Sequence, residues 1–186
     1  MGKNKMSKIF YSDKVICEYE CKEQWEECVD YLKEKILLYP NEKSMLYSFA
    51  ARCWYVLTFW DCSMPKEKLN RSVFENGLEN AYSIAKNNWW NDSDCLWLFG
   101  YFMCINQLDF CYVGVNIDEV EREGERLIKK AYTSTPQNLL AEVLYLADHG
   151  KKSKYMAAKK KLEIKIDMYF SNQSEVDMYF SGIFIE

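Results

Sequence analysis

The stretch DCLWLFGYFMCIN, residues 94–106, is apolar on nearly its whole circumference when it is drawn as a helix. A second stretch, MLYSFAARCWYVL at residues 45–57, has the same character. A helix that is hydrophobic all round is buried on most of its sides. Gly100 follows Ala50 by 50 residues, so both stretches place a small residue at the same point of the period. Together they predict two central, buried helices.

Three times in the chain a charged, amphipathic stretch runs into a short turn and is followed by an aromatic stretch with a helical pattern. The turns centre on Pro40, Asn91 and Pro136, and their spacing of roughly 50 residues is typical of stacked helical hairpins. We therefore predict an all-α protein of stacked helical hairpins, of a degenerate tetratricopeptide-like kind, with about seven or eight helices. Such architectures favour binding of another macromolecule over chemistry.

The chain has 186 residues, enough for one domain with a sizeable core. We expect an irregular segment at 1–16, three helical hairpins at 17–150, and a Lys-rich helix with a short C-terminal helix at 151–186. No uncharged run of 18 residues is present, so no membrane span is expected, and a membrane is not expected as a partner. The basic start at Met1–Lys8 is not followed by an apolar region. This pattern argues against a signal peptide and favours a cytoplasmic protein.

The first charged stretch, Cys17–Leu38, has helical periodicity. Its apolar positions recur at steps of three and four residues: Cys17, Cys21, Trp25, Cys28, Leu32 and Ile36. This face predicts one continuous helix that ends before Pro40. We interpret the eight cysteines of the chain as reduced core residues, because they stand inside apolar helical stretches and no signal peptide is expected. Cys17, Cys21 and Cys28 share one helix face and cannot by themselves close a tetrahedral metal site. No metal or other cofactor is expected.

The sequence shows no catalytic set. His149, the single histidine, stands beside Gly150 at a predicted helix end, and no flanking motif pairs it with a cysteine. Carboxylate pairs such as Glu26–Glu27 lie on charged faces rather than in a pocket that could separate their pKa values. A glycine-rich phosphate loop is also missing. We therefore predict that the protein is not an enzyme.

Charge is unevenly distributed along the chain. Residues 1–150 hold 17 basic and 23 acidic residues, residues 151–186 hold 7 and 5, and the net charge is −4. Acidic strips at 15–34 and 118–125 are either solvated helix faces or docking faces for a basic partner. The seven lysines between 151 and 165 either solvate a helix or contact an acidic partner or RNA. Because most of the chain is acidic, no direct nucleic-acid binding is expected.

Residues 94–106, followed by GERLIKKA at 124–131, resemble the small helical immunity proteins of bacterial polymorphic-toxin systems, among them those of contact-dependent growth inhibition. The resemblance covers about residues 80–150. It implies a cytosolic antitoxin that binds one cognate toxin C-terminal domain and blocks its active site or its access to substrate. It assigns no role to any individual residue of this chain.

Many delivered toxins are basic nucleases, because they must bind polyanionic substrates. An acidic surface on an immunity protein would compete directly with the nucleic acid. We therefore hypothesise that the toxin-binding residues include Glu23, Glu26, Glu27, Asp30, Asp118, Glu119 and Glu121. The alternative is a tetratricopeptide-like adaptor or chaperone that binds a peptide in a helical groove.

Overall fold

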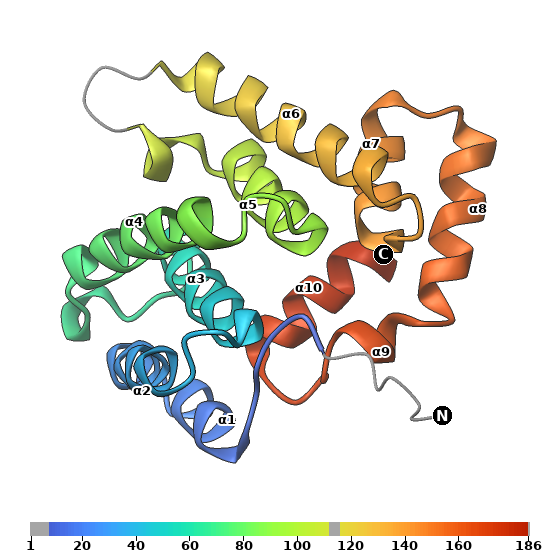
Figure 1. Ribbon diagram of the computed structural model, residues 1–186. Coiled ribbons are helices and arrows are strands. Elements are labelled where there is room, and N and C mark those ends of the chain that lie inside the picture. Colours follow the sequence, from blue (N-terminus) through green and yellow to red (C-terminus); the bar gives the residue numbers. More distant parts are fainter. Residues whose placement is uncertain (1–7, 112–115, 186) are drawn as a thin grey trace.

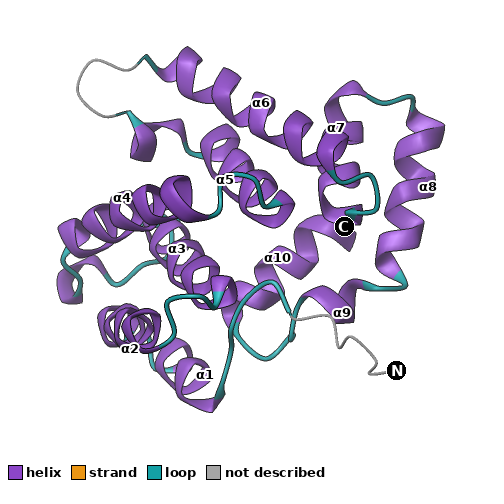
Figure 2. Ribbon diagram, in the orientation of Figure 1, coloured by secondary structure: helices purple, strands orange, loops and turns teal. Residues whose placement is uncertain are grey.

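The computed structural model describes residues 8–111 and 116–185, which form ten α-helices and two short 3₁₀-helices (Figure 1). These residues contain no strand (Figure 2). The α-helices are α1 Lys14–Cys21, α2 Trp25–Leu38, α3 Lys43–Thr58, α4 Arg71–Asn88, α5 Ser93–Ile105, α6 Ile117–Ser134, α7 Leu139–His149, α8 Lys152–Glu163, α9 Ile166–Tyr169 and α10 Glu175–Ile185. The 3₁₀-helices are η1 Lys66–Lys68 and η2 Gln107–Phe110.

The all-α prediction is confirmed, and the described residues form ten α-helices where seven or eight are expected. The difference arises because two predicted helices are each divided in two. The stretch 17–38 contains α1 and α2, and the Lys-rich helix is followed by the separate short helix α9. The likeness to tetratricopeptide repeats stays a prediction.

The helix α1 begins inside the segment 1–16 that the sequence predicts to be irregular. Asp13 caps it, because a carboxylate oxygen of this residue accepts a hydrogen bond from the Ile16 amide at 3.0 Å. The irregular part of the described chain therefore ends at Asp13. Residues 1–7 of the predicted segment lie outside the described residues.

The break between α1 and α2 falls at Glu23, so the prediction of one helix over 17–38 is wrong. Glu23 has a φ of 56°. The amides of Glu23 and Gln24 donate to the carbonyls of Glu20 and Tyr19, each at 2.9 Å. This is a Schellman motif, in which glycine usually occupies the left-handed position. Because glutamate stands there instead, the sequence carries no signal for the break.

The interpretation of the cysteines as core residues needs a correction. All eight are free thiols, and Cys28, Cys53 and Cys95 are buried. Cys21 and Cys62, however, are exposed. The first stands at the C-terminal end of α1, where the predicted helix face is interrupted, and the second lies in the turn after α3.

The closest helix contacts join α3 to α4 and α5 to α6. In each pair a glycine of the charged helix lies against the aromatic helix. A Cβ at Gly77 would come within 2.7 Å of a cysteine sulfur on α3, and one at Gly124 within 2.8 Å of the Gly100 carbonyl oxygen. The helices α4 and α5, the predicted second hairpin, meet through long side chains such as Tyr82 and Phe99, whose ring centroids are 5.8 Å apart. Each of these aromatic helices therefore packs most closely on the charged helix that follows it.

The C-terminal helix α10 lies against the aromatic helices on the side that faces α8 (Figure 1). The ring centroid of Phe180 lies 5.9 Å from that of Trp54 on α3 and 5.8 Å from that of Tyr101 on α5. Phe184 packs edge-on against Trp97 at 5.8 Å. The inner side of the helical stack is thus filled by a helix of the same chain.

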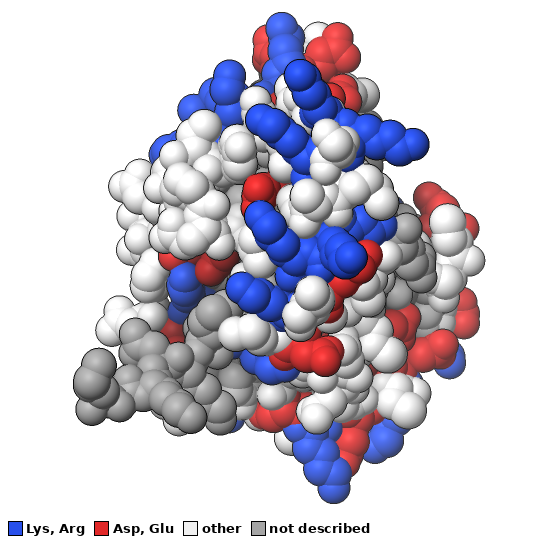
Figure 3. Space-filling view, turned by 90° about the vertical axis from the view of Figure 1, so that its right-hand side faces the viewer, with Lys and Arg blue, Asp and Glu red and all other residues white. Residues whose placement is uncertain are grey.

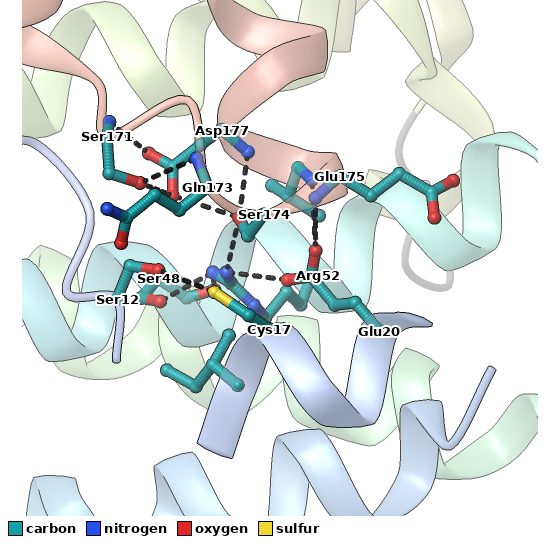
Figure 4. A network of polar contacts seen from close by, with 12 residues as sticks. Ser12, Cys17, Glu20, Ser48, Arg52, Ser171, Gln173, Ser174, Glu175 and Asp177 are labelled. Atoms are coloured by element: carbon teal, nitrogen blue, oxygen red, sulfur yellow. Dashed lines mark hydrogen bonds and ion pairs between the residues drawn. The ribbon is translucent and has the colours of Figure 1, made fainter. Parts of the chain in front are cut away.

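A buried ion pair joins α1 to α3 and to the start of α10 (Figure 4). Arg52 Nη2 lies 2.7 Å from Glu20 Oε1 and donates to Ser174 Oγ at 3.1 Å. The other oxygen of Glu20 accepts from the amides of Glu175 and Val176, so this carboxylate caps α10. Both charged side chains are almost fully buried. The pair therefore fixes the C-terminal helix in place.

Candidate binding surfaces

Four of the seven acidic residues proposed from the sequence line one hollow on the surface, here called the acidic hollow. It lies between the α1–α2 turn, the first turns of α2, and η1. Its acidic members are Glu23, Glu26, Glu27 and Asp30, and its other lining residues are Lys22, Gln24, Lys68 and Leu69. Two lysines therefore stand among four carboxylates.

The left-handed turn explains why these carboxylates gather. Glu23 occupies the turn itself, and Glu27 and Asp30 follow four and seven residues later, on one face of α2. All three are exposed. Glu26 is half-buried, and its carboxylate accepts a hydrogen bond from the Asn70 amide. Glu26 therefore joins α2 to the start of α4 in addition to lining the hollow.

The acidic hollow is only partly neutralised by its surroundings. Asp30 forms an ion pair with Lys33 at 2.8 Å, and such exposed pairs contribute about 1 kcal/mol or less. No ion pair of Glu23 or Glu27 is found within residues 8–111 and 116–185. Glu20, another acid of the strip 15–34, is buried with its cationic partner and adds no surface charge. The exposed negative charge of this strip is therefore smaller than the sequence indicates.

The other three proposed residues, Asp118, Glu119 and Glu121, are exposed on the first turns of α6. They do not belong to the lining of the acidic hollow, and α4 lies between α6 and α2 (Figure 1). Glu119 lines a separate hollow between α4 and α6. The Glu121 carbonyl lies 3.9 Å from the Cys104 thiol of α5. The seven residues are thus divided between two surfaces.

A charged group that the sequence analysis did not identify lies on α4 and η2, between these two surfaces. Arg71 Nε lies 2.8 Å from a Glu75 oxygen, and Arg71 Nη2 lies 3.5 Å from Asp109 of η2. Burial raises the pKa of the Asp109 carboxyl to about 6; nearby Glu75 raises it further, and Arg71 opposes the shift. The spacing of Arg71, Glu75 and Glu79 places them on one helix face and could have indicated the α4 part. Asp109 carries no such signal, because it stands in a short 3₁₀-helix.

A further pocket, with mostly apolar walls, opens between α5, α6 and α7, and both Cys104 and His149 line it. No hydrogen bond joins these two side chains in the part of the chain that the structure describes. Burial raises the pKa of the Cys104 thiol to about 12, and the carboxylates Glu125, Glu121 and Asp148 contribute to the increase. A thiolate is the reactive form of cysteine, so this arrangement works against nucleophilic chemistry.

Within residues 8–111 and 116–185, no group of three His, Cys, Asp or Glu side chains is placed to hold a metal ion. No helix of those residues has both the length and the apolar character needed to cross a bilayer. No protein-family model matches the chain, and no curated protein or solved structure is significantly similar to it.

Proposed function

We propose that this protein is an immunity protein, which binds a cognate toxin domain in the cytoplasm and blocks its active site or its access to substrate. The observation that carries the proposal is the acidic hollow, where four carboxylates gather on one surface. The resemblance of residues 94–106 and 124–131 to immunity proteins supports the same assignment. A nuclease is the toxin that fits best, because a protein that binds nucleic acid presents a basic surface.

Charge complementarity is the physical basis of this recognition. Opposite charges across an interface raise the rate of association and favour one partner over others. Glu23 and Glu27 have no cation to exchange within the described chain, so a lysine or arginine of the toxin can pair with them directly. Asp30 would exchange Lys33 for such a residue, at a cost of about 1 kcal/mol or less.

The left-handed backbone at Glu23 adds to the argument. A side chain other than glycine in this conformation costs on the order of 1–2 kcal/mol, and such positions cluster at functional sites. Glycine at position 23 would form the same turn without the carboxylate. The presence of glutamate at this position favours a use for its charge.

The alternative hypothesis of a tetratricopeptide-like adaptor needs an open helical groove. The inner side of the stack is covered by α10, whose Phe180 and Phe184 contact both aromatic helices. A peptide could bind there only after α10 had left, which would also break the capping of α10 by Glu20. We therefore place the partner on the outer surface.

The test is co-expression with the product of the neighbouring open reading frame as the candidate toxin, with growth rescue and binding affinity as readouts. The variant Glu23→Lys, Glu27→Lys, Asp30→Lys should lose rescue and weaken binding at least about 100-fold. The control variant Glu18→Lys, Glu34→Lys, Glu42→Lys changes the net charge equally at exposed positions outside the acidic hollow. Its affinity for the toxin domain should stay within a few-fold of that of the native protein.

The outcomes separate two possible errors. If the native protein neither binds nor neutralises the toxin domain, the immunity assignment is wrong. If it does both and the two variants behave alike, the immunity assignment stands and the acidic hollow is not the contact.

A further inference from the structure

The helix α8 carries the least compensated charge of the described surface. Seven lysines stand on it and on its flanking residues: Lys151, Lys152, Lys154, Lys159, Lys160, Lys161 and Lys165. Six are exposed and Lys159 is half-buried. Figure 3 shows lysine side chains projecting from the side of the molecule that α8 occupies. Among the described residues none of the seven forms an ion pair, so their charge is directed into solvent.

Apolar side chains are exposed among these lysines. The inward face of α8 buries Ala158 and Leu162. On the outside, Met156 is 52% exposed, Ile164 80% and Met168 46%. Met156 lies on the outer face of α8 with Lys160 four residues later, Ile164 stands in the turn that ends α8, and Met168 lies on α9. The surface thus carries exposed aliphatic side chains among ammonium groups, and it is here called the basic face.

The combination of lysines and exposed aliphatic side chains on the basic face distinguishes between possible anionic partners. Specific protein interfaces are depleted in lysine and use Trp, Tyr and Arg as anchors. Binders of single-stranded nucleic acid add aromatic or arginine stacking to their basic groove. Residues 151–165 contain no arginine, and their one aromatic side chain, Tyr155, is half-buried. An anionic bilayer can bind both the lysines and the exposed aliphatic side chains, because its headgroups attract lysine and its interface accepts aliphatic groups.

We propose, contrary to the expectation from the sequence, that the basic face docks the protein on the surface of an anionic membrane. The lysines pair with lipid headgroups, and Met156, Ile164 and Met168 enter the interfacial layer. Each lysine near such a surface adds to the attraction, so the seven together favour reversible attachment. The helix lies on the bilayer and does not cross it.

The rest of the molecule orients this attachment. The net charge of the chain is −4, so without the seven lysines the remainder is strongly acidic and is repelled by anionic lipids. In Figure 1, α8 and the outer helices α2 and α4 lie on opposite sides of the molecule. Docking through α8 therefore leaves the acidic hollow facing away from the bilayer. The two surfaces can be occupied at the same time.

The test is co-sedimentation of the full chain with vesicles of phosphatidylcholine alone or with roughly one third phosphatidylserine. The native protein should sediment with the anionic vesicles only, and less at high salt, because screening shortens the range of the lysine charges. The variant Lys152→Glu, Lys160→Glu, Lys161→Glu should reduce the bound fraction about tenfold or more. Ile164→Ser should reduce binding while preserving the charge.

The control variant Lys14→Glu, Lys86→Glu, Lys129→Glu makes the same net change at exposed lysines on other helices, and it should bind like the native protein. The proposal is overturned if anionic vesicles do not retain the protein, or if the control variant loses as much binding as the α8 variant. Lysine-dependent binding of a double-stranded RNA without vesicle binding also overturns it and assigns the face to nucleic acid. The assay contains no toxin, so its result is independent of the immunity proposal.

Discussion

The outer helices α2, α4 and α6 and the peripheral helix α8 are all highly charged, but they compensate their charge differently. Each outer helix contains an ion pair between residues three or four positions apart: Asp30–Lys33 at 2.8 Å, Arg71–Glu75 at 2.8 Å and Glu123–Arg126 at 2.6 Å. The described lysines of α8 have no such partner, although Glu163 follows Lys159 by four residues. A run of like charges in the sequence is therefore a poor measure of the charge that a partner meets.

The largest expected effect tests whether the acids of the strip 15–34 contribute equally to stability. Glu20→Gln should lower the free energy of unfolding by about 3–5 kcal/mol, because it removes the ion-pair partner of the buried Arg52. Glu27→Gln, on the exposed face of the same strip, should change it by less than about 0.5 kcal/mol. Urea unfolding of the two variants measures both values. Equal effects would mean that the distinction between buried and exposed acids is wrong.

The next prediction compares the packing of the α5–α6 crossing with that of α10, the helix against which α8 packs. Gly124→Ala should destabilise the protein by about 1–3 kcal/mol, because the new Cβ would lie 2.8 Å from the Gly100 carbonyl oxygen at the α5–α6 crossing. Gly182→Ala, on the helix against which α8 packs, meets no atom within 4 Å. It should be neutral or stabilise α10 by up to about 1 kcal/mol. Thermal unfolding should show a lower melting temperature for Gly124→Ala and an equal or higher one for Gly182→Ala, and a stable Gly124→Ala variant would contradict the close crossing.

A smaller effect on the free energy of unfolding depends on pH and concerns Asp109 of η2, which lies near Arg71 of α4. Burial raises the pKa of Asp109 to about 6, above the value near 4 of an unfolded chain. The native state therefore binds more protons between pH 4 and pH 6, and the stability contributed by this group falls as pH rises through that window. Asp109→Asn should equal the native protein near pH 4 and exceed it by about 1–2 kcal/mol at pH 7. A constant difference in urea unfolding at the two pH values would count against this.

The smallest effect separates backbone strain from charge in the acidic hollow. Glu23→Gly should raise the free energy of unfolding by about 1 kcal/mol or less, because glycine adopts the left-handed conformation freely. The same variant should bind the toxin domain more weakly, because a carboxylate has been removed. Asn172→Gly is the matched control, since Asn172 has a φ of 54° and lies in the loop before α10. If Glu23→Gly binds as tightly as the native protein, its carboxylate is not a contact.

The sequence predicts the buried helices well, because residues 45–57 and 94–106 are apolar on all sides and need no distant partner to be recognised. It does not predict the break at Glu23, since the Schellman motif there lacks the usual glycine. It also misses the position of α10, which depends on contacts between residues more than 120 positions apart, such as those of Trp54 and Phe180.

The arrangement of the candidate site residues is likewise predicted only in part. Glu23, Glu27 and Asp30 share a hollow because a turn and a helix face bring them together, and their spacing within α2 gives part of this arrangement. The separation of Asp118 from that group depends on the position of α4 between α2 and α6, which no local pattern encodes. Whether an acid has a neutralising partner likewise depends on side-chain placement.

The central claim is that the acidic hollow, and not the basic face, binds the toxin domain. Isothermal titration of the purified toxin domain into three proteins tests it most directly: the native chain, the Glu23/Glu27/Asp30→Lys variant, and the Lys152/Lys160/Lys161→Glu variant. We predict tight one-to-one binding by the native chain, a loss of about 100-fold or more in the first variant, and little change in the second. Equal weakening in both variants, or a loss confined to the α8 variant, would contradict the account.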